Sequence, residues 1–260
     1  WGFATFAAIT AVALTPLVYF LMKDRPEEIG EVRDGRKYVE SKPDEQVVIE
    51  EDARVWRWHE MLKSPAFWSI GLVFGSMGCV YSAVMLHLLG HLMDIGVERT
   101  MAAWVLSATA LFAALGKPVV GWLSDAFGAK VSIWLALVCQ AASLLILAEA
   151  DTFWGALAAG CLYGFGYSGM SPLRTFALST AMGSVSFASA AGVIRFVELP
   201  LVISASPLAG FIYDSTGSYR IAFFILAGLM AVACIGPLFM KAGGARERYK
   251  LRDAADRGAA

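Results

Sequence analysis

Charged residues are scarce in this sequence, and they are unevenly spread. They make up 17% of the 260 residues, whereas soluble domains average about 25%. A water-soluble helical bundle needs a polar face on each helix, yet long segments here have no Asp, Glu, Lys or Arg. These uncharged segments are residues 1–22, 66–93, 131–148, 152–173 and 221–240. Since roughly 20 apolar residues cross a bilayer, the composition excludes a soluble protein and predicts one embedded in the lipid bilayer.

Several chemical signatures are also missing. The cysteines form no Cys-x-x-Cys pair and lie in apolar segments, at Cys79, Cys139, Cys161 and Cys234. Neither a disulfide framework nor a metal site is therefore indicated. The phosphate-binding pattern Gly-x-x-x-x-Gly-Lys-[Ser/Thr] does not occur, and no nucleophile–base constellation is evident. We therefore predict no enzyme, no cofactor and no nucleic-acid partner.

Two further apolar segments contain charge. Residues 101–122 include Lys117, and residues 187–213 include Arg195 and Glu198. With the five uncharged segments they predict seven transmembrane helices, and the fold class is an all-α membrane protein. Trp1 is not an initiator methionine and begins inside an apolar segment, so we expect the whole protein to have sequence before it.

Basic residues outside the apolar segments indicate the orientation. Nine Lys or Arg fall in residues 23–65 and six in residues 241–260; Lys117, Lys130 and Arg174, the last predicted to lie in a connection, are assigned to the same side. The opposite side has only Arg99 and Arg220. Because cytoplasmic loops carry the positive excess, four regions are predicted. They are a membrane helix (1–22), a cytoplasmic central loop (23–65), a six-helix bundle (66–241) and a cytoplasmic tail (242–260).

An internal repeat divides the predicted bundle. The motif Pro118-x-x-Gly121-x-x-x-Asp125-x-x-Gly128 recurs as Pro207-x-x-Gly210-x-x-x-Asp214-x-x-Gly217. The two copies imply two three-helix units, residues 66–148 and 153–240. Three is an odd number of crossings, so the two copies are predicted to face opposite sides of the membrane. Inverted repeats of this kind are typical of secondary transporters, whose binding sites lie between the repeats near the membrane midplane.

The first copy of the motif resembles a known signature. Gly121-Trp-Leu-Ser-Asp125-Ala-Phe-Gly128-Ala-Lys130 is similar to the signature loop of the major facilitator superfamily, although Ala126 stands where that family often has Arg. The resemblance implies twelve helices in the whole protein, of which this chain holds the sixth to the twelfth. It also implies that the six-helix half before residue 1 supplies the other wall of the site.

Within the superfamily, the sequence most resembles monocarboxylate transporters and oxalate–formate antiporters. Lys117-Pro118-x-x-Gly121 is similar to a segment of those proteins in which Arg precedes the Pro and holds the substrate carboxylate. Ala113 stands where the family has an Asp. Gly192-Val-Ile-Arg195-Phe-Val-Glu198-x-Pro200 resembles the eleventh helix of the family. The resemblance implies that Lys117 and Arg195 bind an anionic substrate.

Arg195 and Glu198 are the most informative charges in the sequence. At 1.5 Å per helical residue, Arg195 lies roughly 12–18 Å from the start of its predicted helix, close to the midplane. A charge there costs at least about 2.5–3.5 kcal/mol and usually faces a cavity or a partner. The spacing i, i+3 places both side chains on one helical face. Two interpretations stay open: a structural ion pair, or a substrate-binding Arg195 beside a proton-coupling Glu198.

Other polar residues also have two interpretations. Lys117 either binds a carboxylate or extends its side chain to the membrane interface. His87 and His91 lie four residues apart on one helical face; they are interfacial side chains or take part in coupling, and no third metal ligand accompanies them. Gly121, Asp125, Gly128 and Lys130 are predicted to act in gating, with Asp125 also capping the next helix.

The sequence therefore predicts a secondary active transporter in the plasma (inner) membrane. Its predicted substrate is a small organic anion, a mono- or dicarboxylate, moved by alternating access with proton coupling or anion exchange. The alternative is a membrane receptor or scaffold that keeps the fold without transporting. Charge inside the membrane separates the two, because a scaffold has little reason to retain Arg195 and Glu198.

Overall fold

The computed structural model describes residues 2–21, 55–183 and 185–240, and every regular element in these ranges is a helix. The chain divides into two units, residues 1–50 and 51–260. The predicted central loop lies mostly outside the described residues, and the predicted tail lies wholly outside them. The all-helical prediction is confirmed for the described ranges.

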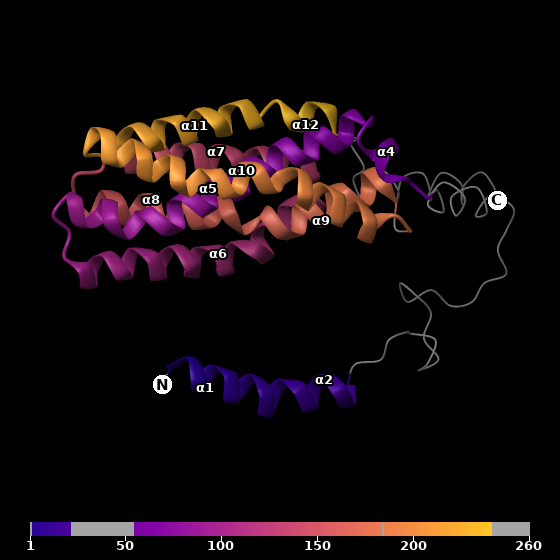
Figure 1. The fold of residues 1–260 in the computed structure, drawn as a ribbon, viewed down its shortest axis with the longest axis horizontal. Coiled ribbons are helices and arrows are strands. Elements are labelled where there is room, and N and C mark those ends of the chain that lie inside the picture. The colour runs from indigo at the N-terminus through magenta and orange to yellow at the C-terminus, as the bar shows by residue number, and fades with distance from the viewer. Residues whose placement is uncertain (1, 22–54, 184, 241–260) are drawn as a thin grey trace, which may run out of the picture. The chain divides into compact units, whose positions relative to one another are not determined.

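The first unit contains one apolar helical segment. It consists of α1 (Gly2–Ile9), a π-helical turn η1 (Thr10–Leu14) and α2 (Thr15–Leu21), shown in indigo in Figure 1. Pro16 lies within this continuous helix and has no N–H group to donate to the turn before it. The wider π turn ends two residues before this proline, at Leu14. Residues 2–21 are thus helical, as predicted for the first span.

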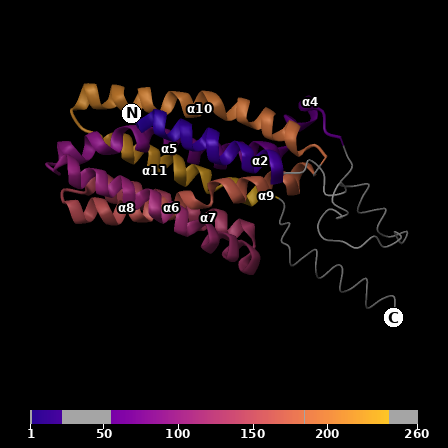
Figure 2. The same ribbon diagram turned by 90° about the horizontal axis from the view of Figure 1, so that it is seen from below.

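The second unit is a bundle of helices that run along a common direction (Figures 1 and 2). Its helices are α4 (Trp58–Met61), α5 (Pro65–Asp94), α6 (Arg99–Phe127), α7 (Ala129–Glu149), α8 (Phe153–Ser168), α9 (Met170–Met182), α10 (Phe187–Thr216), α11 (Arg220–Ala233) and α12 (Gly236–Phe239). Within the described ranges, five helical segments are long and apolar enough to cross a membrane. They are α5, α6, α7, α10 and the segment from Arg220 to Phe239 that holds α11 and α12. The count of seven spans stays a prediction.

The predicted span 152–173 is wrong at its end. The chain forms α8, breaks at Gly169 and continues as α9 as far as Met182. Arg174, which we expected in a cytoplasmic connection, is therefore helical and buried. Pro172 lies in the first turn of α9, where a residue without a backbone N–H group is tolerated. The end of this span was predicted wrongly because composition alone does not distinguish a charged residue in a loop from one that is buried against a partner.

Glycines bring α6 and α8 into close contact. A Cβ atom on Gly160 would lie 2.8 Å from Thr109 Oγ1, and one on Gly116 would lie 2.5 Å from Ser168 Oγ. A Cβ on Gly164 would overlap the carbonyl oxygen of Thr109. Small residues at such interfaces let helix backbones approach in a membrane, where the hydrophobic effect does not drive helix association. The glycine-rich sequence around residue 160 therefore serves close packing.

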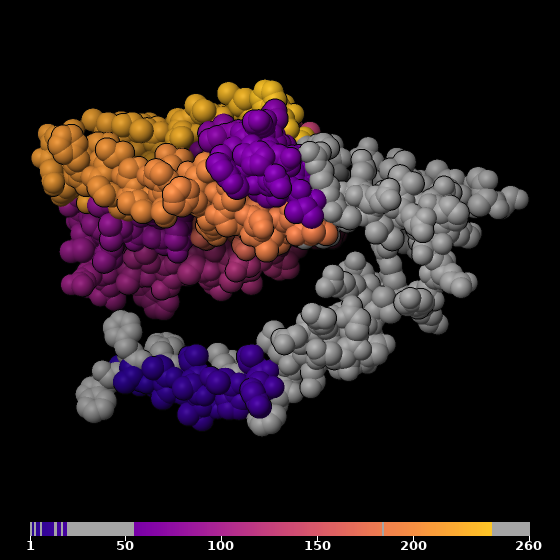
Figure 3. All heavy atoms as spheres, turned by 45° about the vertical axis from the view of Figure 1, so that its right-hand side comes forward, coloured from indigo at the N-terminus to yellow at the C-terminus, as the bar shows by residue number. Residues whose placement is uncertain are grey.

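Helices α5 and α10 lie side by side and run in the same direction. A Cβ on Gly71 would meet Ile194, and one on Gly78 would meet Val202. Farther along, the hydroxyls of Ser82 and Ser206 are 3.1 Å apart. Residue numbers increase together along both helices, so both begin at the same end of the bundle. In Figure 3 the purple atoms of α4 pack against orange α10 at this starting end, where the Trp56 N–H group donates to Ser186 Oγ at 2.8 Å.

The parallel arrangement places the two motif copies at opposite ends of the bundle. α6 returns toward the end where α5 begins, so Gly128 lies there, whereas Gly217 follows the far end of α10. This is the geometry that the inverted repeat predicts. In a variant without the native cysteines, Ser124→Cys should react only with reagent on one side of the membrane and Ser218→Cys only with reagent on the other. Labelling of both from the same side of intact cells would contradict the inversion.

Candidate functional site

A cavity of about 470 Å³ opens among α5, α6, α8, α9 and α10. Its volume falls within the range of roughly 300–1,000 Å³ that is common for small-molecule sites. Three basic residues and one acidic residue line it: Lys117 from α6, Arg174 from α9, and Arg195 and Glu198 from α10. The remaining lining residues are Gly78, Tyr81, Tyr167, Ser168, Met170, Ser171, Thr175, Leu178, Phe187, Ala191 and Val202. With Glu198 ionised, the lining carries two net positive charges.

Glu198 is the acidic centre of this site. Its Oε2 atom lies 3.3 Å from Arg174 Nη2 and 3.9 Å from Arg195 Nη1. The Glu198 and Arg174 side chains are only 2% and 8% exposed, whereas that of Arg195 is 64% exposed. The two arginines therefore share one carboxylate oxygen, but only Arg174 forms a buried pair with it. Isolated buried charges are costly, so each member of this pair lowers the cost of burying the other.

The buried pair is incompletely satisfied. Arg174 Nη1 and Glu198 Oε1 are buried and have no hydrogen-bond partner among the described residues. Such groups cost free energy in a low-dielectric interior unless water or a ligand meets them. One donor of Arg174 thus remains unsatisfied beside a cavity that is already rich in positive charge. This arrangement is suited to an anion that brings its own acceptor oxygens.

A glycine of α5 makes room for the buried pair. A Cβ on Gly75 of α5 would lie 3.2 Å from Glu198 Cγ, so glycine lets α5 pack directly over the carboxylate stem. The break at Gly169 starts α9 at a new helix N-terminus, five residues before Arg174. The site is thus built by five helices, two of which, α8 and α9, meet at the break at Gly169.

Lys117 lies deeper in its helix than we predicted. α6 continues to Phe127, roughly 15 Å beyond Lys117 at 1.5 Å per residue, and not to residue 122. The ammonium side chain is exposed, lines the cavity and makes no ion pair within the described ranges. The longer helix favours the cavity interpretation over extension of Lys117 to the interface.

His87 and His91 lie outside the cavity lining. His87 Nε2 is 2.9 Å from the Ser206 carbonyl oxygen and Nδ1 is 3.2 Å from the Tyr219 hydroxyl. Because a carbonyl only accepts, Nε2 carries a proton, and in the neutral ring Nδ1 accepts from Tyr219. Burial, with the carboxylates of Asp94 and Asp214, raises the pKa of Tyr219, so that hydroxyl keeps its proton at neutral pH.

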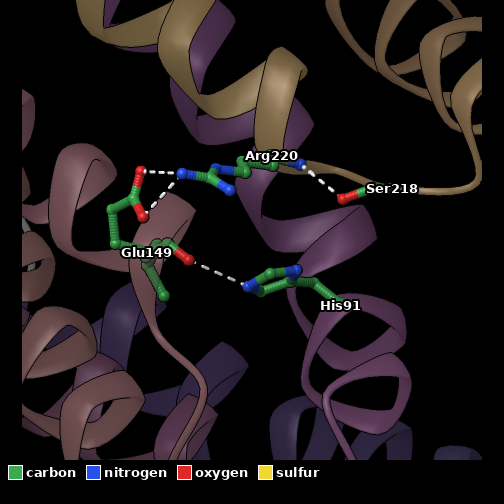
Figure 4. Close-up of polar contacts among 5 residues, drawn as sticks. His91, Glu149, Ser218 and Arg220 are labelled. Carbon is green, nitrogen blue, oxygen red and sulfur yellow. Dashed lines mark hydrogen bonds and ion pairs between the residues drawn. The ribbon is translucent and has the colours of Figure 1, made fainter.

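His91 also has a hydrogen-bonding role in the fold. Its Nε2 atom donates to the carbonyl oxygen of Leu147 at 3.0 Å, which joins α5 to α7 (Figure 4). Nearby, Arg220 Nη2 lies 2.5 and 2.7 Å from the two carboxylate oxygens of Glu149. Both partners of this ion pair are more than half exposed, and such pairs contribute about 0–1 kcal/mol. The part of the chain that the structure describes has no group of three His, Cys, Asp or Glu that could hold a metal ion.

The expected cap by Asp125 is wrong. Asp125 lies within the last turn of α6, and no side chain caps α7, which begins after Gly128. Gly128 instead ends α6 with φ of +93°, and Gly217 ends α10 with φ of +70°. Such positive φ values favour glycine because it lacks a Cβ atom. The last glycine of each motif copy is therefore explained by structure, because it ends a helix.

Comparison with known proteins identifies the family. Residues 88–258, about two thirds of the chain, match the Major Facilitator Superfamily. The chain belongs to this superfamily. It is accordingly an integral multi-pass membrane protein, and the resemblance inferred from the signature loop is confirmed.

Several curated members of the superfamily are similar to the chain. Monocarboxylate transporter 13 of Bos taurus is 32% identical over 162 residues, which cover 61% of this chain and 37% of that protein. Monocarboxylate transporter 7 of Homo sapiens is 27% identical over 182 residues, covering 67% and 34%. Monocarboxylate transporter 12 of Mus musculus is 26% identical over 171 residues, covering 64% and 35%. The matched region spans about a third of the length of these relatives.

The predicted site residues of this superfamily member are not all gathered in one place. Lys117, Arg195 and Glu198 lie around one cavity, and Arg174 joins them although the sequence interpretation missed it. The signal that could have pointed to Arg174 is Glu198 itself, since a buried carboxylate is costly without a cation nearby. Lys130 lines a separate small cavity of about 20 Å³, near Gly128. The gating role of Gly121, Asp125, Gly128 and Lys130 and the coupling role of His87 and His91 stay predictions.

Proposed function

We propose that the whole protein is a secondary active transporter that carries a small organic anion, a mono- or dicarboxylate, across the plasma membrane. The observation that carries the proposal is Nη1 of buried Arg174, which has no hydrogen-bond partner among the residues that the structure describes and lies beside Lys117 and Arg195. Guanidinium groups bind carboxylates through two parallel hydrogen bonds. The similar proteins are named as monocarboxylate transporters, and this supports the same substrate class.

Competition between Glu198 and the substrate for Arg174 and Arg195 would couple the binding of a proton to the binding of the anion. The Glu198 side chain and the substrate are both carboxylates, so both can pair with the same guanidinium groups. Protonation of Glu198 would remove its charge and release both arginines for the substrate. Departure of the substrate would leave the arginines unpaired, which favours loss of the proton from Glu198. If a second anion replaces the first instead, the same arginines support exchange without a net proton movement.

Alternating access would then move the loaded site from one side of the membrane to the other. In this mechanism the bundle of residues 66–241 rocks against the preceding six helices, around a site near the midplane. The gating motif at Gly121–Lys130 would lie at the cytoplasmic end of the bundle, where the two halves move relative to each other. The mechanism needs no cofactor beyond the proton or the exchanged anion.

Arg195→Gln should strongly reduce carboxylate uptake. Losing a charge-assisted hydrogen bond costs roughly 1.5–3 kcal/mol, so uptake by the full-length protein in proteoliposomes should fall about tenfold or more at subsaturating substrate. Arg195→Lys should keep the charge but lose the bidentate geometry, giving an intermediate loss. Glu198→Gln should abolish proton-driven uptake and retain exchange. Tracer uptake with and without an imposed pH gradient measures all three.

The matched control is Arg220→Gln, which removes an arginine that does not line the cavity. It should leave uptake near the wild-type value. Wild-type uptake by Arg195→Gln would rule out this site. Absence of any carboxylate uptake or binding by the wild-type protein would favour the receptor or scaffold alternative.

A further inference from the structure

Three tyrosine rings form a parallel stack that ends at the cavity. The rings of Tyr163 and Tyr167 on α8 have centroids 6.3 Å apart and are inclined by 9°. The rings of Tyr167 and Tyr81, the latter on α5, are 4.4 Å apart and inclined by 11°. Tyr167 thus lies between the other two. The stack begins at fully buried Tyr163 and passes toward the side chains that line the site.

The open end of the stack is Tyr81. Tyr81 and Tyr167 both line the 470 Å³ cavity, together with Lys117, Arg174 and Arg195. Tyr81 is 39% exposed, and within the described ranges its ring contacts that of Tyr167 and no other. Aromatic rings attract other rings in offset-stacked or edge-to-face geometry, which contributes about 0.5–1.5 kcal/mol beyond burial. One aromatic surface in the cavity is therefore available to a further ring.

We infer that the site prefers carboxylates that carry an aromatic ring. The carboxylate pairs with the arginines while the ring extends the tyrosine stack on Tyr81. This inference rests on the proposed anion transport and adds the class of substrate. The cavity exceeds the needs of an acid of two or three carbons, and its lining combines cationic groups with tyrosine and methionine side chains. Met170 adds a polarisable side chain, which also favours aromatic neighbours.

A purely structural stack makes a different prediction. If the tyrosines only join α5 to α8, the site should not distinguish an aromatic ring from a saturated ring of the same carbon number. Phenylacetate and cyclohexylacetate provide this comparison, because both are monoanions at neutral pH with equal carbon counts. The saturated ring is the more apolar of the two, so a preference for phenylacetate cannot arise from hydrophobic burial alone.

The test is competition for tracer uptake by the full-length protein in proteoliposomes, with protein-free liposomes as the correction for leak of the acids. The wild-type protein should bind phenylacetate about threefold to tenfold more tightly than cyclohexylacetate. Tyr81→Phe keeps the ring and should keep this preference. Tyr81→Leu removes the ring and should reduce the preference to near unity. Trp104→Leu, which changes an exposed aromatic side chain outside the cavity lining, should leave the preference intact.

The outcomes separate this inference from the proposed function. Uptake of both acids without a preference would overturn the aromatic inference and leave anion transport standing. A preference that survives Tyr81→Leu would also overturn it, because the selectivity would come from elsewhere. Failure to take up any carboxylate would instead refute the proposed function.

Discussion

Arg174→Gln should destabilise the helix bundle more than the loss of any exposed charge. The substitution leaves Glu198 only 2% exposed and without its partner at 3.3 Å. Removing one partner of a buried ion pair typically costs roughly 3–5 kcal/mol, because the remaining charge is buried and uncompensated. Arg195, 3.9 Å from the same oxygen, offsets part of this cost, so we expect a loss near the lower end. The apparent melting temperature of the full-length protein in detergent measures it.

The double variant Arg174→Gln/Glu198→Gln separates stability from function. With both charges removed, no uncompensated charge remains, so the melting temperature should recover toward the wild-type value. Carboxylate uptake should stay lost because the anchoring guanidinium is gone. Arg220→Gln, which breaks an exposed pair, should change stability by no more than about 1 kcal/mol. Strictly additive losses in the double variant would show that Arg174 and Glu198 do not act as a pair.

Gly164→Ala should be the most damaging glycine substitution in the glycine-rich helix α8. The added Cβ would overlap the carbonyl oxygen of Thr109 and lie 3.1 Å from the backbone nitrogen of Ala113. These are main-chain atoms of α6, which cannot turn aside as a flexible side chain can. Overpacking of this kind costs typically 1–3 kcal/mol and occasionally more, and we expect about 3 kcal/mol here. The yield of folded protein and its melting temperature should both fall.

Gly228→Ala is the matched control for this packing argument. Gly228 lies inside α11, and a Cβ there would meet no atom within 4 Å. The same chemical change should therefore be neutral or stabilise the helix by up to about 1 kcal/mol, since alanine favours helix more than glycine does. Equal melting temperatures for the two variants would mean that α6 and α8 are not held together at Gly164.

The membrane-crossing segments were predictable because partitioning into lipid depends on local composition. A run of about 20 apolar residues indicates a span, and the helices of residues 65–149 begin and end within five residues of the predicted limits, α6 differing most at its end. The inverted orientation of the motif copies was also predictable, because an odd number of crossings separates them. Where local composition was ambiguous, the prediction failed: Arg174 ended a predicted span although α9 continues past it.

Side-chain partners were less predictable than the spans. Spacing placed Arg195 and Glu198 on one helical face, and both line the cavity. It could not show that Glu198 pairs more closely with Arg174, which is 24 positions earlier in the chain. It also gave no indication that His91 bonds the Leu147 carbonyl or that Asp125 leaves α7 uncapped. Such partners depend on how helices rotate and pack, which no single helix determines.

The sequence by itself determined the class of this protein: an all-helical membrane protein of the Major Facilitator Superfamily with an inverted repeat. It did so because apolar length and the positions of Pro, Gly and Asp are local properties of the chain. Only the tertiary structure decided that Lys117, Arg174, Arg195 and Glu198 meet at one cavity beside the ring of Tyr81. These residues come from four different helices, and the rotation and depth of each helix are set by its packing against the others.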